Sequence, residues 1–115
     1  MKKVQLQSET MLPGGISQGQ LDVLKGKHLE IHIVTVHKTA TEALTGYFKK
    51  PSRDVLANVI NMSTEGKVFE AREFLANNTK VAGDDEILTN EDVAIAAQIQ
   101  LWKSLDFLKA EVRKY

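Results

Sequence analysis

Residues 28–37, HLEIHIVTVH, are the part of the sequence that most constrains the fold. Leu29, Ile31 and Ile33 alternate with polar side chains, which is the two-residue period of a β-strand. The β-branched residues that follow favour the same conformation. A strand needs a neighbour, and residues 43–49 can return beside it after a polar turn. The sequence therefore predicts a β-hairpin.

The apolar residues change to a helical repeat after Pro51. Two apolar stripes, at 55–60 and 68–75, predict two helices with a break at 63–66 between them. We expect a loop with acidic residues at 81–88. The hairpin should therefore be followed by helices.

The last helix is expected to run from about residue 90 to about residue 112, with Thr89 as its N-cap and acidic residues in its first turn. Its apolar residues form a face so wide that the helix should be buried on two sides. One of these sides is available for an intermolecular contact. The partner-binding residues assigned to it are Ile99, Trp102, Leu105 and Leu108.

A short helix at about 18–25 should precede the hairpin. Ser17 and Gln20 have the spacing of a capping box, and Ile16 and Leu21 have that of a hydrophobic staple. This order of elements predicts an α+β fold: a short β-hairpin followed by a three-helix segment, with a short N-terminal helix.

The domain organisation follows from length and from one breaker. We expect residues 1–15 to form a flexible N-terminal tail, because they are polar and end in Pro-Gly-Gly. Residues 16–115 should form a single α+β domain, which suits a chain of 115 residues.

Composition excludes several classes of protein. Lys and Arg total 15, and so do Asp and Glu, which argues against a general polyanion binder and makes self-association easier. The chain has no cysteine, which excludes disulfides and thiolate chemistry. The apolar runs are too short for a membrane span, and the N-terminus lacks the apolar part of a signal peptide. We therefore expect a cytoplasmic protein.

Two groups of polar residues could bind a metal, but neither forms a complete ligand set. His28, Glu30 and His32 share one strand face, and a metal site would need further ligands and a second shell. We interpret this face as solvated. The acidic run at 83–86 lacks the alternation of a calcium loop. Because no nucleophile motif or phosphate-binding loop is evident either, we expect no enzyme, no metal and no cofactor.

Residues 47–54, YFKKPSRD, form a basic corner between the hairpin and the next helix. The two aromatic rings could stack on bases while the cations contact phosphates, and Ser52 could be phosphorylated. An architectural interpretation explains more of the residues: Pro51 stops strand pairing, Pro51 or Ser52 starts the helix, and Asp54 lies in its first turn. The cations left exposed, and free to contact an acidic partner, are Lys49, Lys50 and Arg53.

This order of features resembles the small tail assembly chaperones of long-tailed bacteriophages and prophages. The features that carry the resemblance are the aromatic–basic–Pro–Ser–Arg corner at 47–53, two short helices, a Gly-Asp loop at Gly83, and a terminal helix through Trp102, Leu105 and Leu108. The resemblance covers roughly residues 28–110. The residues before this range have no counterpart, and Asn77 and Asn78 stand where family members often carry Cys or Trp.

The resemblance implies a protein that coats the long, helical, aggregation-prone tape measure protein before the tail tube assembles in the bacterial host. It also implies self-association along the client, no enzymatic activity and, in some members, a longer frameshifted form. The main alternative is a small nucleic-acid-binding accessory protein that uses the basic corner at 49–53. The third hypothesis is a metal-dependent enzyme that uses His28, Glu30 and His32.

Overall fold

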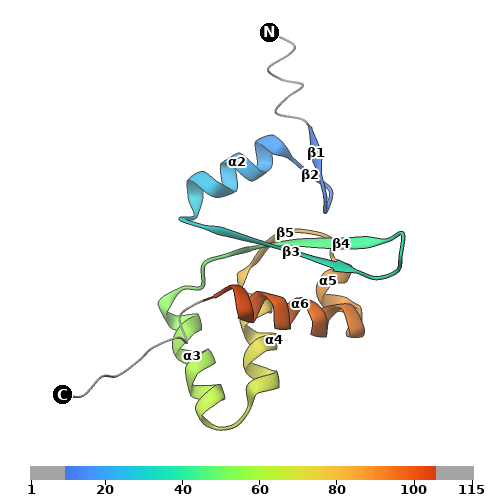
Figure 1. Ribbon diagram of the computed structural model, residues 1–115. Helices are drawn as coiled ribbons and strands as arrows, with labels where there is room; N and C mark the ends of the chain where they lie inside the picture. Colours follow the sequence, from blue (N-terminus) through green and yellow to red (C-terminus); the bar gives the residue numbers. More distant parts are fainter. Residues whose placement is uncertain (1–9, 106–115) are drawn as a thin grey trace, which may run out of the picture.

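The computed structural model describes residues 10–105, which form a mixed α+β fold (Figure 1). Within that range the chain has five helices and two antiparallel sheets, of two and three strands. In chain order the elements are β1 (Met11–Leu12), β2 (Ile16–Ser17), α2 (Gln18–Lys27), β3 (Ile31–His37), β4 (Ala43–Lys49), α3 (Arg53–Thr64), α4 (Val68–Thr79), β5 (Lys80–Gly83), α5 (Glu86–Thr89) and α6 (Glu91–Ser104). The predicted α+β class is confirmed.

The three-stranded sheet has the order β3-β4-β5, with β4 in the centre. β3 and β4 pair antiparallel over all seven residues of each strand, with Val34 opposite Gly46 at the middle of the ladder. The predicted hairpin is therefore confirmed. Its first strand begins at Ile31 rather than at His28, and Leu29 is 95% exposed because it precedes the ladder.

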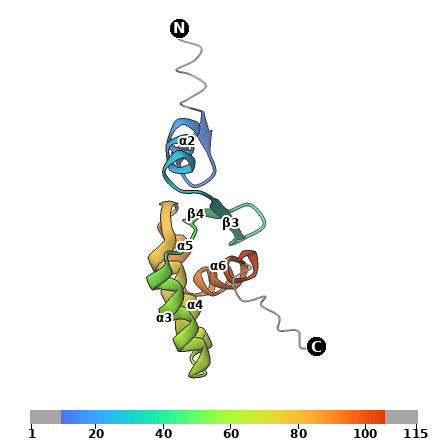
Figure 2. The same cartoon turned by 90° about the vertical axis from the view of Figure 1, so that its left-hand side faces the viewer.

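Two adjacent aromatic residues on β4 enter separate apolar clusters, because neighbouring side chains on a strand point to opposite faces. Phe48 is 0% exposed and lies in the main core, which β3 and β4 form with α3, α4, α5 and α6. Tyr47 is 2% exposed and lies in a second cluster with residues of β2 and α2. Figure 2 shows α2 on one side of the sheet and α3, α4 and α6 on the other. Both faces of the sheet therefore carry an apolar cluster.

The two clusters differ in size. The buried residues of the main core are Val34, Phe48, Val59, Ala71, Leu75, Ala76, Ile87, Val93, Ala97, Leu101 and Leu105. The buried residues of the second cluster are Ile16, Leu21 and Tyr47.

Residues 81–88, which we expected to form a loop, contribute to a third strand and a short helix. β5 pairs antiparallel with β4, next to an irregularity at Tyr47 and Phe48. The two backbones approach so closely that a Cβ on Gly83 would lie 2.4 Å from the carbonyl oxygen of Thr45. The backbone N–H of Thr45 also donates to the Asp84 carboxylate over 2.9 Å. The hairpin is therefore followed by α3, α4, a strand, α5 and α6, instead of by three helices alone.

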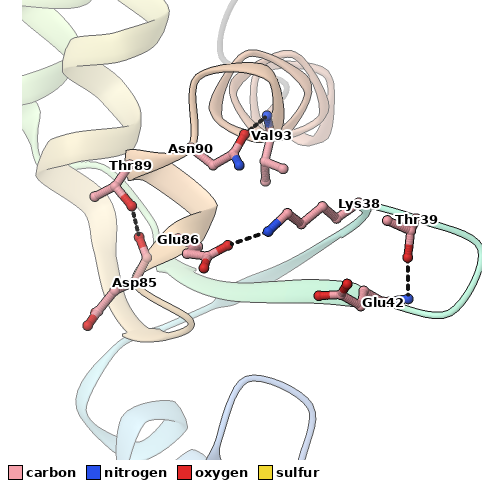
Figure 3. Close-up of polar contacts among 8 residues, drawn as sticks. All are labelled: Lys38, Thr39, Glu42, Asp85, Glu86, Thr89, Asn90 and Val93. Carbon is pink, nitrogen blue, oxygen red and sulfur yellow. Dashed lines mark hydrogen bonds and ion pairs between the residues drawn. The ribbon is translucent and has the colours of Figure 1, made fainter.

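The N-cap of α6 is Asn90, one residue after the position we expected. Its side-chain oxygen accepts a hydrogen bond from the backbone N–H of Val93 over 3.2 Å (Figure 3). Thr89 instead ends α5, where its hydroxyl donates to the carbonyl of Asp85 over 3.3 Å. Because Thr89 is the last residue of the short helix α5, the N-cap of α6 lies one residue later than predicted.

The helix α6 is shorter than predicted. It ends at Ser104, and Leu105 has extended backbone angles. Leu108 and Val112, which we expected in this helix, lie outside the described residues. None of the helices between residues 10 and 105 is long and apolar enough to cross a membrane.

The N-terminal part of the described chain packs onto the sheet. Ser17 and Gln20 form the predicted capping box, with hydrogen bonds of 3.1 and 2.7 Å, and α2 continues to Lys27. Of the predicted flexible tail at 1–15, residues 11–15 form β1 and the turn into β2, whereas residues 1–9 lie outside the described residues. The Tyr47 hydroxyl donates to the carbonyl of Pro13 over 2.6 Å and fastens this turn to β4.

Candidate functional site

The basic corner at residues 47–54 is built as a junction between β4 and α3. Pro51 is buried, and the Ser52 hydroxyl accepts a hydrogen bond from the backbone N–H of Val55 over 3.3 Å, which caps α3. Tyr47 and Phe48 are enclosed in the two apolar clusters, so neither ring can stack on a base without leaving its cluster. The corner therefore presents cations without an aromatic platform.

The three cations of this corner differ in exposure. Lys50 and Arg53 are exposed, and Lys49 is half-buried. Within residues 10–105 none of the three forms a salt bridge. Lys50 lines a hollow of about 300 Å³ together with Glu30 and His32 of the hairpin. The corner can therefore offer positive charge to a partner at this hollow.

A chain of polar contacts borders the same hollow. His32 Nε2 lies 2.6 Å from Glu30 Oε2, and His32 Nδ1 lies 3.1 Å from Ser104 Oγ. The His32 side chain is only 16% exposed, because α6 covers its face of β3. Our interpretation of this face as solvated was therefore wrong for His32.

The Ser104–His32–Glu30 contacts have the order of a hydrolase triad, but their position does not suit acyl transfer. Ser104 is the last residue of α6. Unpaired carbonyl groups gather at that end of a helix, and they would repel a developing oxyanion. We interpret the contacts as a link that fastens the end of α6 to β3.

The three residues considered as metal ligands are not brought together as a set. His28 precedes β3, whereas His32 lies within it and contacts Glu30. In the described part of the chain, no group of three or more His, Cys, Asp or Glu side chains is placed to hold a metal ion.

The apolar face of α6, which we assigned to partner contacts, lies mainly in the main core. Leu105 is 7% exposed, and Ile99 and Trp102 are half-buried. The guanidinium of Arg72 lies 5.7 Å from the centre of the Trp102 ring, within the range of a cation–π contact. Leu108 lies outside the described residues. A short chain has few apolar faces with which to build a core, so this face is largely used within the protein.

An apolar groove is lined by residues of α2 and β5. The helix α2 lies on the opposite side of the sheet from α6 (Figure 2). Its volume is about 530 Å³. Its lining residues are Ile16, Ser17, Gly19, Gln20, Val23, Leu24, Val81 and Ala82. Val23 is 68% exposed, so one wall of the groove has an apolar side chain open to solvent. We take this groove as the candidate functional site.

The groove was not predicted from the sequence. Its walls come from Val23 and Leu24 on one helix and from Val81 and Ala82 in a segment that we expected to be a loop. Two features could have indicated it. Val23 falls outside the stripe that buries Leu21, and the apolar pair at 81–82 lies between polar residues.

A salt bridge outside the groove joins the β3–β4 turn to α5. Lys38 Nζ lies 3.1 Å from Glu86 Oε2 (Figure 3). The hydrogen bond to Glu86 and the charge of its carboxylate raise the pKa of Lys38 above its usual value. Burial, assisted by the Asp84 carboxylate, raises the pKa of Tyr47. Both groups therefore keep their protons at neutral pH.

Fold and site together define a small α+β protein with an open apolar groove. Comparisons with protein-family models, with curated proteins and with solved structures find no match to this chain.

Proposed function

We propose that this protein is a non-enzymatic assembly chaperone that binds an apolar stripe of a long helical client in the cytoplasm of a bacterial host. The resemblance to phage and prophage tail assembly chaperones makes the tape measure protein the expected client. The observation that supports the proposal most strongly is the apolar groove between α2 and β5.

The groove has the properties that an amphipathic helix requires of its receptor. Both walls are apolar, with Val23 and Leu24 on one side and Val81 and Ala82 on the other. The groove between these walls has a volume of about 530 Å³. A client helix would place apolar anchors at spacings of three and four residues into it. Covering Val23 would gain about 25 cal/mol for each Å² of apolar surface removed from water.

The client contact is therefore placed at α2, and not at the face of α6 that was predicted from the sequence. The sequence predicted α6 because of its wide apolar face, but much of that face packs in the main core, with Ile99 and Trp102 half-buried. The groove lies beside the smaller second cluster, so a client can reach it without disturbing the main core.

The first test is the coding sequence beside the gene for this protein. We expect a very long, helix-rich chain there, preceded by a second short overlapping frame. Neighbouring genes of unrelated metabolism or regulation would contradict a role in tail assembly.

The second test is binding of that long chain, measured by calorimetry with Val23→Glu and Val68→Glu variants. Val23 lines the groove, whereas Val68 is the first residue of α4 and is 39% exposed, so the pair places the same substitution on two partly exposed surfaces. We expect Val23→Glu to weaken binding at least tenfold, which is about 1.4 kcal/mol, and Val68→Glu to leave it unchanged. Loss of binding with Val68→Glu alone would place the client on the α3–α4 side and contradict the groove.

A second candidate function is nucleic-acid binding at the basic corner. It is favoured by Lys50 and Arg53, which are exposed and form no salt bridge within the described chain. Phosphate contacts by these side chains would make binding weaken steeply as salt is added. Binding of single-stranded and duplex oligonucleotides should then fall in a Lys50→Ala, Arg53→Ala variant and persist in Val23→Glu. Absence of binding at low salt would remove this candidate.

A further inference from the structure

We propose that the N-terminal segment, residues 1–9, docks in the groove between α2 and β5 and occupies it when no client is bound. Three observations support this docking: where the described chain begins, how far nine residues reach, and how their side chains alternate. The docking stands independently of any client, whereas competition with a client rests on the function proposed above.

The described chain begins beside the first turn of α2, whose residues line one end of the groove. The backbone N–H of Gln18 donates to the carbonyl of Thr10 over 2.7 Å, so Thr10 lies beside the first residue of α2. The groove is lined from the same end of the helix, by Ile16, Ser17 and Gly19. The preceding residues can therefore enter the groove without a long connection.

The segment is long enough to follow the whole groove. The helix α2 has 10 residues, so at 1.5 Å per residue it is about 15 Å long. Nine extended residues span at most about 30 Å. The segment can therefore reach past Leu24, the last helix residue that lines the groove.

The side chains of the segment suit a surface that is apolar on one side and wet on the other. In an extended conformation Val4 and Leu6 point one way, and Gln5 and Gln7 point the other. Val4 and Leu6 can fill the groove while the glutamines face water. Among the strands of residues 10–105, β5 pairs with β4 alone, so an extended segment beside Val81 and Ala82 could add to its outer edge.

Docking of a tethered segment needs little affinity. A segment joined to its site by a short connection is present at an effective concentration of about millimolar. A client that uses the same groove must displace it, so the apparent affinity for the client falls by the fraction of molecules whose groove is free. The N-terminal segment would then keep an apolar groove covered until a client competes for it.

The test is a spin-label measurement on the full chain. The protein has no cysteine, so Lys2→Cys gives a single site for a nitroxide. We expect the label to broaden the amide signals of Leu24 and Ala82 and to leave those of α3, such as Ile60, sharp. The control carries the same label with Val4→Asp and Leu6→Asp, and in it the broadening at Leu24 and Ala82 should disappear.

Three outcomes would overturn the docking: no broadening in the groove, equal broadening with and without the two Asp substitutions, or broadening centred on β3 and α6. Client affinity separates this inference from the proposed function. If the segment docks and a client binds the groove, Val4→Asp with Leu6→Asp should tighten client binding. If the broadening is seen but the client never binds, the docking stands and the chaperone proposal fails.

Discussion

The two faces of the three-stranded sheet are built differently. On one face, eleven buried residues from the sheet and from α3, α4, α5 and α6 form the main core. On the other face, three of the residues between 10 and 105 are buried in the second cluster: Ile16, Leu21 and Tyr47. The apolar groove lies beside the smaller cluster. The comparison indicates that one face supplies most of the stability, and that the incomplete packing of the other leaves an apolar surface for binding.

A matched pair of leucines tests this division most directly. Leu75 of the main core is 0% exposed, and Leu21 of the second cluster is 5% exposed. We expect Leu75→Ala to lower the free energy of unfolding by about 4 kcal/mol and Leu21→Ala by about 2 kcal/mol. Leu21 has few buried neighbours, so its surroundings can relax around the cavity, whereas Leu75 is enclosed in the main core. Urea unfolding of both variants measures the difference.

Hydrogen exchange on the same two variants sharpens the comparison. Leu21→Ala should increase exchange mainly in α2 and the β1–β2 hairpin, because local opening involves only the smaller cluster. Equal losses of stability for both variants, with exchange raised throughout, would show that the two faces unfold as one unit. The proposed division between stability and binding would then be wrong.

Two adjacent glycines test how the β1–β2 turn rests on the sheet. Gly14 and Gly15 both have positive φ angles, of 88° and 76°. A Cβ on Gly14 would lie 2.8 Å from the carbonyl oxygen of Thr45, whereas one on Gly15 would meet nothing within 4 Å. Gly15→Ala should therefore cost about 1 kcal/mol from backbone strain alone, and Gly14→Ala at least about 2 kcal/mol because the turn must also move.

Thermal unfolding measures the two costs, and exchange of the β1 and β2 amides locates the change. If both variants lose the same stability, the turn is not held closely against β4. The β1–β2 hairpin would then not be anchored on the sheet. The end of the groove that Ile16 and Ser17 line would lose its support.

Much of the fold could be predicted where the information is local. The alternation at 28–37 and the return at 43–49 predicted the β3–β4 hairpin, and Ser17 with Gln20 predicted the start of α2. Ser52 was one of two predicted starts for α3. Each of these depends on residues within a few positions of one another, so spacing alone is enough.

The parts that failed depend on contacts between distant residues. β5 was missed because Gly83 has no side chain that could contribute to an alternation of apolar and polar residues. The position of β5 is set by the close approach of the Gly83 backbone to Thr45. The groove was missed because Val23 and Val81 meet only after the sheet forms. The partner contact at the face of α6 stays a prediction, and the sequence alone does not show that much of this face also packs in the core.

The Tyr47 hydroxyl gives a smaller effect with a distinct pH dependence. Tyr47→Phe removes the 2.6 Å hydrogen bond to Pro13, which should cost about 1 kcal/mol at neutral pH. Burial, and secondly the Asp84 carboxylate, raise the pKa of Tyr47, so the folded protein holds this proton more tightly than the unfolded chain. Stability should therefore decline as pH rises above about 10, where an unfolded tyrosine ionises.

This decline should be weaker in Tyr47→Phe, and denaturant unfolding between neutral and alkaline pH measures it. Tyr115, the other tyrosine of the chain, is retained in both proteins and serves as the internal reference. Identical slopes in the two proteins would show that Tyr47 ionises as freely as in the unfolded chain. The link between the β1–β2 turn and β4 would then be loose.

The smallest expected effect is that of the Lys38–Glu86 salt bridge, which joins the β3–β4 turn to α5. Its side chains are 34% and 55% exposed, so solvent and salt screen their attraction. Glu86→Gln should leave the unfolding temperature unchanged within error. It should lower the pKa of Lys38, since the hydrogen bond and charge of Glu86 are what raise it. NMR titration of the Lys38 ammonium group measures this change, with Glu65→Gln, whose partner Lys67 lies 3.6 Å away, as the control. A fall of several degrees in the unfolding temperature would mean that surface charge holds the hairpin on α5. The contrast between the two faces of the sheet could then no longer be ascribed to buried apolar side chains alone.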